Sequence, residues 1–595
     1  MSGTAALHDD ASGRSGVAAS RGIVIGPAYV LRRERLVIPE YHVETHQVPG
    51  EIQRLETAFS ETRARLHEIR EGMKETGLLG DVFDAQFLFL EDPTLLENAR
   101  RNVQELLLNA EWALQRELRR LEALFESMPD PYIRERSSDI SFVVRRVLQA
   151  LMGREPEGLK NAPPGVVVVA NDLTPAELAQ VHRGHIAGFV TEAGSPTSHV
   201  TIIARSLEIP SVVGVGTGLA RDLTDGTVLI VDGSAGRVLI DPSPDTIAEY
   251  ERRRDQRAMF ERQLLRYVDL PAETKDGVLI RMLANVDQVD EIPDALRYGA
   301  EGIGLYRTEF LFMNRTDLPS EDEQFEAYKA VLEAIAPRHA VIRSLDLGGE
   351  KVPSGLDISE EPNPALGLRG VRMSIARPDI FRTQLRALVR ASAYGRLKIM
   401  VPMISSLSEV IFSREQLDRV TEELRAEGVT GSAKLELGVM IETPAAATIS
   451  DLIAPHADFL SIGTNDLMQY TLAVDRTNEH VAYLYEPLHP ANLRLIQRTC
   501  QAARRVGIPV TMCGEMAGDP LHAWILMALG VGELSMAASS IPLLKKIVRD
   551  STAAEGRDLL AAVYRLGGAE EIRHHVEQHM ARRFPLEFEQ IGASG

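Results

Sequence analysis

The sequence has little cysteine, and it lacks a long uninterrupted apolar run. Only Cys500 and Cys513 occur among 595 residues. Two cysteines are too few for a secreted fold held together by disulfides and are typical of a reducing compartment. The longest apolar runs are strand-sized, as in Val166–Ala170, and none reaches the ~18 residues that cross a bilayer. We therefore expect a cytoplasmic protein with no membrane insertion.

Positive charge is also scarce. The chain has 65 Lys and Arg against 85 Asp and Glu, a formal charge of −20, and its pI is near 5.3. An acidic chain repels phosphate backbones, so we expect no nucleic-acid partner and favour a partner with a basic face. The triplet Arg252–Arg254 is typical of a solvated helix face. With 44% hydrophobic and 25% charged residues, the composition excludes a disordered, collagen-like or coiled-coil protein, and the length suggests several domains.

Helical periodicity dominates the residues before about position 155. Apolar side chains lie three or four residues apart between Glu51 and Met73, again from Val103 to Phe125, and again from Ile140 to Leu151. These spacings predict a bundle of amphipathic helices, with one helix over 103–125. The segment Met1–Ser20 lacks the apolar core of a signal peptide, and we expect a flexible tail there.

Short buried strands flank this helical block. They are expected at Gly22–Leu31, Val166–Ala170, Gly188–Thr191 and Thr227–Asp232. The pattern predicts an α/β domain that the helices interrupt. The charged stretch Pro242–Val268 that follows is expected to be a linker helix.

After Pro271, eight short apolar runs alternate with helical segments. These runs are Val278–Asn285, Gly302–Thr308, Ala340–Asp346, Leu397–Met403, Leu437–Thr443, Phe459–Asn465, Pro509–Cys513 and Glu533–Ala537. Periodicity alone fits either a (β/α)8 TIM-type barrel or an open doubly wound sheet. Most runs end in polar groups such as Arg307, Glu442 and Asp466, and barrel enzymes collect catalytic residues at the carboxyl ends of their strands, so we favour the barrel.

A small-residue loop, Gly194–His199, follows the expected strand Gly188–Thr191. If a helix begins after this loop, its backbone N–H groups form a seat for a phosphoryl group. A neutral imidazole can attack phosphorus and carry the phosphoryl group, which makes His199 a candidate nucleophile. A helix-capping loop with an incidental histidine fits the same residues.

A second candidate site lies at the predicted barrel mouth. Glu442 and Asp466 are carboxylates at successive strand ends and could hold Mg²⁺, which takes one or two carboxylates plus water and substrate oxygens. Guanidinium groups suited to phosphate and carboxylate, and one amide, are offered nearby by Arg307, Arg343, Arg476 and Asn465. Ion pairs across the barrel rim are the alternative for each of these residues.

The two cysteines differ in context. Cys500 fits the ordinary role of a small buried hydrophobe. Cys513 ends a predicted barrel strand, where a thiol beside cationic groups could exchange a proton with a carbon centre. A buried structural cysteine is the alternative for Cys513 as well.

Several contiguous motifs resemble one known family. They are GSPTSH, GLYRTEFLFM, DLGGEK, NPALGLRGVR, GVMIETPAA, SIGTNDLMQYTLAVDR and MCGEMAG, in this order. They resemble Enzyme I of the phosphotransferase system, among the enzymes that use phosphoenolpyruvate. The resemblance implies a tail (1–16), a phosphohistidine α/β domain (17–44 and 156–241), a helical domain that binds the carrier HPr (45–155), a linker helix (242–269), and a barrel that binds phosphoenolpyruvate and forms a homodimer (270–590).

The resemblance also implies roles. His199 would take the phosphoryl group from phosphoenolpyruvate, releasing pyruvate, and pass it to HPr, the first step of sugar uptake. Mg²⁺ would be held by Glu442 and Asp466, and Cys513 would protonate the pyruvate enolate. The substrate would contact Arg307, Arg343, Asn465 and Arg476, with Lys351 and Arg369 as weaker candidates. The phosphohistidine domain would swivel about Gly158–Pro163 and Ile240–Pro244.

Two departures from the family pattern concern partners. Ser195 and Pro196 replace a glycine and a basic residue beside His199, and Gln86 stands where many members have histidine. Phe87, Phe89 and Leu90 could form core or carrier contacts, and we expect core. The alternatives are a regulatory, nitrogen-type paralogue and a non-catalytic signalling protein that binds a carrier. Pyruvate phosphate dikinase and phosphoenolpyruvate synthase share the motifs, but we expect no room here for their nucleotide-binding domain.

Overall fold

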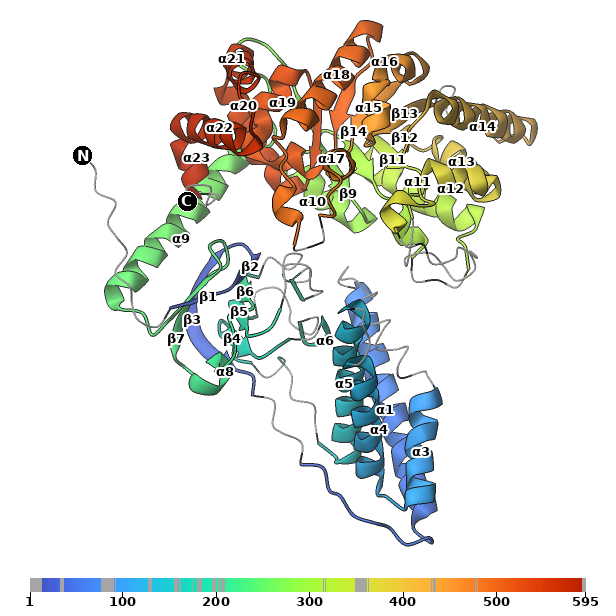
Figure 1. The fold of residues 1–595 in the computed structure, drawn as a ribbon, viewed down its shortest axis with the longest axis vertical. Helices are drawn as coiled ribbons and strands as arrows, with labels where there is room; N and C mark the ends of the chain where they lie inside the picture. Colours follow the sequence, from blue (N-terminus) through green and yellow to red (C-terminus); the bar gives the residue numbers. More distant parts are fainter. Residues whose placement is uncertain are drawn as a thin grey trace. The chain divides into compact units, whose positions relative to one another are not determined.

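A computed structural model gives the fold of the chain (Figure 1). It describes residues 13–32, 37–75, 90, 93–126, 131–154, 159, 162–173, 175–178, 185–194, 200–201, 204, 209–313, 315, 317–347, 361, 363–429, 431, 435–476, 478 and 480–590. The chain forms two compact units, Met1–Ala258 and Met259–Gly595. Within the described residues, no helix is both long enough and apolar enough to span a membrane.

The first unit contains a helical bundle of α1 (Val48–Glu75), α3 (Pro93–Leu106), α4 (Ala110–Glu126) and α5 (Pro131–Leu151). Buried Leu55, Phe59, Leu114 and Val143 belong to its apolar core. The expected single helix over 103–125 is wrong, because the chain breaks into α3 and α4.

The break between α3 and α4 has a tertiary cause. Leu107 adopts a left-handed backbone conformation with φ of 52°, and Leu108 pairs with His42 in an antiparallel bridge. The Asn109 amide donates to the Pro39 carbonyl at 2.9 Å, and its oxygen accepts the Tyr41 N–H at 3.2 Å. Contacts with the segment before α1 therefore replace the helical hydrogen bonds at this point.

The first unit also contains an eight-stranded sheet in the order β1-β8-β7-β3-β4-β5-β6-β2. Its strands are β1 (Gly13–Ser15), β2 (Val17–Ser20), β3 (Ile23–Val30), β4 (Val167–Ala170), β5 (Gly188–Thr191), β6 (Ser211–Val213), β7 (Val228–Asp232) and β8 (Arg237–Ile240). Short helices α6 (Pro175–Leu178) and α8 (Leu219–Asp222) lie between strands, and α9 (Pro244–Leu264) is a helix within the stretch 242–268. The bundle helices interrupt the strands between β3 and β4, as predicted.

Both edges of this sheet are made by the start of the chain. β1 pairs antiparallel with β8, and β2 pairs antiparallel with β6 at the opposite end of the strand order. Gly16 alone separates β1 from β2, and its N–H donates to the Gly236 carbonyl at 2.8 Å. The flexible tail expected over Met1–Ser20 is therefore wrong for the seven residues of β1 and β2, three of which lie within the tail over 1–16 that the resemblance implies.

The second unit is a closed barrel of eight parallel strands. They are β9 (Arg281–Val286), β10 (Ile303–Tyr306), β11 (His339–Arg343), β12 (Arg396–Val401), β13 (Glu436–Ile441), β14 (Phe459–Ile462), β15 (Val510–Met512) and β16 (Glu533–Met536). All eight overlap the predicted runs. Because β16 pairs with β9, the barrel is confirmed and the open sheet is excluded.

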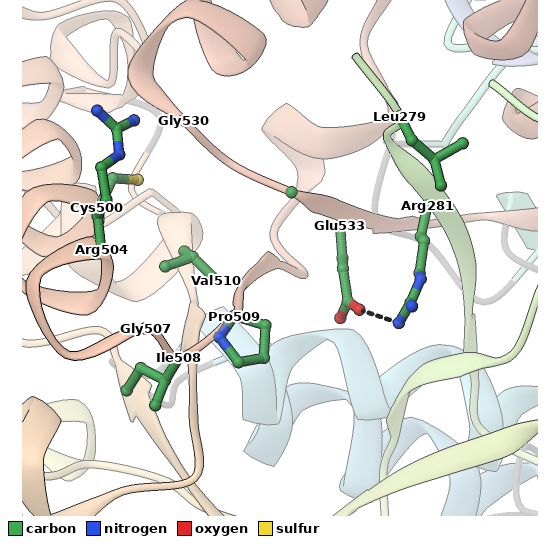
Figure 2. Close-up of a pocket in the computed structure, with 11 residues that line it drawn as sticks. Leu279, Arg281, Cys500, Arg504, Gly507, Ile508, Pro509, Val510, Gly530 and Glu533 are labelled. Carbon is green, nitrogen blue, oxygen red and sulfur yellow. Dashed lines mark hydrogen bonds and ion pairs between the residues drawn. The ribbon is translucent and has the colours of Figure 1, made fainter. Parts of the chain in front are cut away.

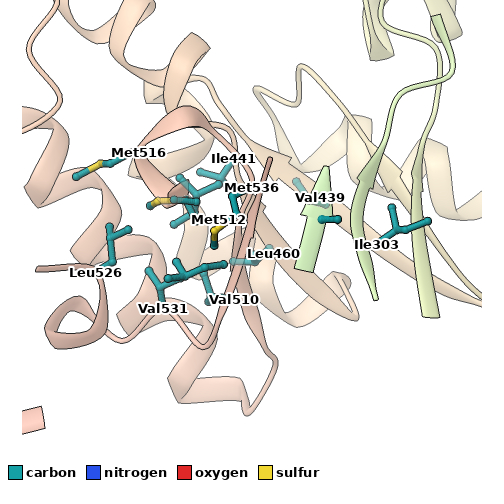
Figure 3. Packing of buried hydrophobic residues seen from close by; sticks show 14 of the residues in the cluster. Ile303, Val439, Ile441, Leu460, Val510, Met512, Met516, Leu526, Val531 and Met536 are labelled. Atoms are coloured by element: carbon teal, nitrogen blue, oxygen red, sulfur yellow. The ribbon is translucent and has the colours of Figure 1, made fainter. Parts of the chain in front are cut away.

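Helices surround this barrel (Figure 1). They are α10 (Ile292–Arg297), α11 (Glu321–Ile335), α12 (Val371–Ala376), α13 (Pro378–Ala391), α14 (Leu407–Ala426), α15 (Pro444–Thr448), α16 (Ser450–Ile453), α17 (Thr464–Leu472), α18 (Pro490–Val506), α19 (Ala523–Leu529), α20 (Ile541–Asp550), α21 (Ala553–Val563), α22 (Ala569–Arg583) and α23 (Pro585–Gln590). Figure 3 shows alternate strand residues such as Leu460, Val510 and Met512 packed in the buried cluster that includes Leu526 of α19. The other strand residues face the barrel interior, where Met400, Met440 and Phe459 form a separate cluster with Cys513.

Candidate active site

The predicted barrel residues come together at one end of the barrel. Arg307 follows β10, Arg343 ends β11, Glu442 follows β13 and Cys513 follows β15, while Asp466 lies in the first turn of α17 after β14. All eight strands are parallel, so their carboxyl ends share one rim. The alternation of interior and exterior residues along each strand aims these side chains at a common mouth.

A buried ion-pair network links two arginines through one carboxylate. Asp346, whose side chain is 0% exposed, lies 3.2 Å from Arg343 Nη1 and accepts hydrogen bonds from Arg369 Nε and Nη2 at 2.9 and 2.7 Å. Burial alone would raise the pKa of Asp346, but Arg343 and Arg369 hold it below its ordinary value. Glu309 accepts a further bond from Arg343 Nη2 at 3.0 Å. The arginine-rich side of the mouth is therefore fixed in place.

Arg369 extends this network to α17, which follows β14. Its Nη2 donates to Asp466 Oδ2 at 3.1 Å, and its Nη1 donates to the Tyr470 hydroxyl at 3.2 Å. The Tyr470 hydroxyl in turn donates to the Ala365 carbonyl at 2.5 Å. Arg369, a weaker candidate by sequence, thus lies at the centre of the network.

Glu442 stands apart from the arginines as a buried carboxyl group. Its Oε1 accepts the Met403 N–H at 2.6 Å. Burial raises its pKa to about 8, and repulsion from Asp346 and Asp466 adds to the effect, which Arg343 partly offsets. Without a bound cation, Glu442 is therefore mainly protonated at neutral pH.

This raised pKa makes the stability of the unliganded protein depend on pH. Between the ordinary value of 4.5 and about 8, the folded state holds a proton on Glu442 that the unfolded chain has lost. The free energy of unfolding should therefore fall by about 1 kcal/mol per pH unit from pH 5 to 8 and level off above pH 8. Urea unfolding in EDTA should show this slope as the difference between the parent and a Glu442→Gln variant; parallel profiles would contradict it.

Cys513 lies beside these charges in the barrel interior. Burial raises the pKa of its thiol to about 11, and Glu442 raises it further, whereas Ser461, Arg343 and Arg307 lower it. The thiol is therefore protonated at neutral pH and can act as a proton donor rather than as a nucleophile.

The remaining predicted residues line the rim. Arg307 Nη1 donates to both Asp287 oxygens at 2.9 and 3.0 Å. Asn465 Nδ2 donates to Glu515 Oε1 at 3.1 Å, and its Oδ1 accepts the Glu515 N–H at 3.0 Å. Exposed Arg476 is joined to the same area through a hydrogen bond to Tyr485, whose hydroxyl donates to the Asn465 carbonyl at 3.2 Å.

The two carboxylates Glu442 and Asp466 suit a cation whose other ligands are water and substrate oxygens. Among the described residues, no group of three or more His, Cys, Asp or Glu side chains is placed to hold a metal. Glu442 and Asp466 repel each other, and a cation between carboxylates would relieve that repulsion. Two carboxylates with open positions are what Mg²⁺ accepts. The arginines are also paired with acids, so the ion-pair alternative describes Arg307 and Arg343 in this structure.

Several predicted residues lie outside the described residues. They are His199, Ser195 and Pro196 of the loop, Gln86, Phe87 and Phe89 of the helical domain, and Lys351. The approach to the loop is described: β5 leads to Gly194, whose φ is 131° and where a Cβ would lie 2.9 Å from Val213 Cβ. Glycine is therefore required at this turn. Leu90 is buried, as the core interpretation predicts.

Sequence reasoning missed the acidic partners of the arginines. Asp287 directly follows β9, so the rule that selected Arg307 and Glu442 would have found it. Glu309 lies two residues after Arg307 in GLYRTEF, but nothing in the sequence indicates that it pairs with Arg343. Tyr470 lies in α17 and carries no local signal of its role.

A separate cavity lies at the opposite end of the barrel (Figure 2). It measures about 500 Å³ and is lined by residues at the amino ends of β9, β15 and β16. Figure 2 shows the Arg281–Glu533 ion pair, 3.1 Å long, on one side of this cavity and Arg504 on the other. None of the predicted site residues that the structure describes lines it.

Comparisons with known proteins agree with this architecture. Three family models match: PEP-utilising enzyme, N-terminal (15–136), mobile domain (162–236) and PEP-binding domain (261–553). A phosphoenolpyruvate-protein phosphotransferase from Geobacillus stearothermophilus is 44% identical over 95% of this chain and 97% of its own length. One from Bacillus subtilis is 41% identical over 95% and 99%. The chain therefore belongs to the phosphoenolpyruvate-protein phosphotransferases, the Enzyme I family of PEP-utilising enzymes.

Proposed function

We propose that His199 takes the phosphoryl group from phosphoenolpyruvate bound at the barrel mouth and passes it to the carrier HPr. The observation that carries this proposal is the fixed network of Arg343, Asp346 and Arg369 beside Glu442 and Cys513. An anion site, a cation site and a proton donor at one rim are the parts that phosphoryl transfer from an enol phosphate requires.

The substrate's phosphate and carboxylate would bind Arg307, Arg343, Asn465 and Arg476. A hydrogen bond to Asp287 orients the Arg307 guanidinium at the rim. Ion pairs with Glu309 and Asp346 hold the Arg343 guanidinium. Because these arginines are already oriented, an arriving dianion finds donors in place and gives up little binding energy to ordering side chains.

Mg²⁺ would be held by Glu442 and Asp466. When bound, it offsets the negative charge that spreads over the transferring phosphoryl group. Glu442 must lose its proton for this, since a cation takes the carboxylate form. Cys513 would then give its proton to C3 of the enolate left after phosphoryl transfer, which completes pyruvate.

Three further features belong to this proposal. The protein would act in the cytoplasm, pair with a second copy through the barrel domain, and swivel about Gly158–Pro163 and Ile240–Pro244. The swivel would let one histidine serve both the barrel mouth and the carrier. Transfer to HPr would place the protein at the first step of sugar uptake.

The test is to map the phosphoryl group directly. Purified protein with Mg²⁺ and phosphorus-labelled phosphoenolpyruvate should acquire an acid-labile, base-stable label, and peptide mapping should place it on His199. Addition of HPr should discharge the label. No label, or a label on another residue, would contradict the proposed mechanism; a label that HPr does not discharge would contradict the choice of carrier.

A further inference from the structure

The sulfur of Cys513 has few polar neighbours. The hydroxyl of Ser461 donates to Sγ at 3.3 Å, and the thiol itself points to the Ile462 carbonyl at 3.7 Å. The surrounding interior cluster is apolar, with Leu305, Met440 and Phe459 among its members. Ser461 therefore supplies the hydroxyl donor that reaches the sulfur among the described residues.

Other contacts hold the main chain of Cys513. Its N–H donates to the Ile462 carbonyl at 3.1 Å, and its carbonyl accepts a bond from Asn285 Nδ2 at 3.0 Å. Asn285 is fixed in turn by Ser535, whose hydroxyl donates to Asn285 Oδ1 at 2.6 Å. These contacts hold the Cys513 backbone without help from Ser461. The hydrogen bond from the Ser461 hydroxyl therefore acts on the sulfur and not on the position of the main chain.

At the buried position of Ser461, a hydroxyl group destabilises the folded state unless it makes a hydrogen bond. Ser461 is fully buried on β14, opposite Met440 of β13 and Thr511 of β15. A buried hydroxyl needs a partner, and a neutral thiol sulfur is a weak acceptor. A thiolate is a much stronger one, because hydrogen bonds to charged groups exceed those to neutral groups.

We propose that Ser461 is a positioning residue that acts through Cys513 and stabilises the thiolate formed when Cys513 protonates the enolate. This inference rests on the proposed function. In the step, the S–H bond breaks and a C3–H bond forms. The electron pair of the enolate C2–C3 double bond makes the new C–H bond, C2 becomes a ketone, and the negative charge moves to sulfur. Solvent then returns a proton to the thiolate.

The first measurement is the rate at which the full-length protein, with HPr in excess, releases pyruvate from phosphoenolpyruvate, because protonation of the enolate follows phosphoryl transfer and completes pyruvate. Loss of a hydrogen bond to a charged group should slow a Ser461→Ala variant by about 10- to 100-fold. Ser413→Ala is the matched control, because Ser413 is equally buried but bonds only its own helix, at the Glu409 carbonyl. The control should keep the parent rate.

The second measurement separates chemistry from damage to the site. Oxalate, a planar dianion shaped like the enolate, needs no proton, so its inhibition constant should stay within about twofold of the parent value in Ser461→Ala. In a Cys513→Ala background, followed over long incubations, removing Ser461 should have little additional effect, because partners that act as a unit are not additive.

The outcomes distinguish the role of Ser461 from the proposed function of the protein. An unchanged rate in Ser461→Ala would overturn the role of Ser461, and so would a parallel loss of oxalate affinity or a full additional loss without Cys513. If the parent protein itself takes no label from phosphoenolpyruvate, the failure lies in the proposed function and not in Ser461.

Discussion

Replacing Glu442 by glutamine is expected to slow phosphorylation by phosphoenolpyruvate by about 10²- to 10³-fold, the range seen when one preorganised electrostatic group is removed from an active site. Glutamine has nearly the same volume and can still accept the Met403 N–H that Glu442 accepts at 2.6 Å. It resembles the protonated carboxyl that the raised pKa favours at neutral pH. The variant should therefore fold normally and lose the charge that a cation needs.

The measurement is the initial rate of label incorporation over a Mg²⁺ titration. The same strand provides the control: Glu436 begins β13 at the other end of the barrel and pairs with Lys398 at 3.0 Å. Glu436→Gln should keep the parent rate. A Glu442→Gln variant with the parent rate and the parent Mg²⁺ dependence would show that this carboxylate does not hold the metal.

Replacing Asp346 by alanine is expected to lower the free energy of unfolding of the barrel by about 3–5 kcal/mol, the usual loss when one member of a buried ion network is removed. The side chain is fully shielded and binds Arg343 and Arg369 together. Its removal leaves Arg343 with Glu309 and Arg369 with Asp466, but takes away the one carboxylate that two buried guanidinium groups share. The substrate site should also loosen, because Arg343 loses one of its two anchors.

Urea unfolding can report this loss in the barrel alone. The chain has two tryptophans, Trp112 in the helical bundle and Trp524 in the barrel, so a Trp112→Phe background makes buried Trp524 the reporter. Asp379→Ala is the control, since Asp379 is largely exposed and pairs with half-exposed Arg377. An exposed pair contributes about 0.5 kcal/mol or less. Equal effects of the two substitutions would contradict a structural role for the Asp346 network.

The barrel was predictable because its signals are local. Each strand is a short apolar run, most runs end in a polar residue, and this rule selected Arg307, Glu442 and Cys513, which lie at the rim. The break at Leu107 was not predictable, because Leu107 fits the helical spacing and the cause is a contact with residues near His42. Strands of three or four residues, such as β1 and β6, contain too few side chains to show a period.

The candidate residues of the site were predictable, but their pairings were not. Arg307 and Asp287 are 20 positions apart, and Arg343 and Glu309 are 34 apart. Closure of the barrel, rather than spacing along the chain, brings them together. Ser461 illustrates the limit further: a serine inside a buried strand gives no sign of which neighbour receives its hydroxyl.

The position of β1 and β2 has a consequence for solubility. An unpaired sheet edge presents free N–H and C=O groups to which strands of other molecules can add, and this is a common route to aggregation. The barrel has no such edge, because β16 closes on β9. The sheet of the first unit has two, and both are short strands from the start of the chain, Gly13–Ser15 beside β8 and Val17–Ser20 beside β6. The exposed edges are therefore only three and four residues long, and such short edge strands offer an added strand few backbone groups to pair with.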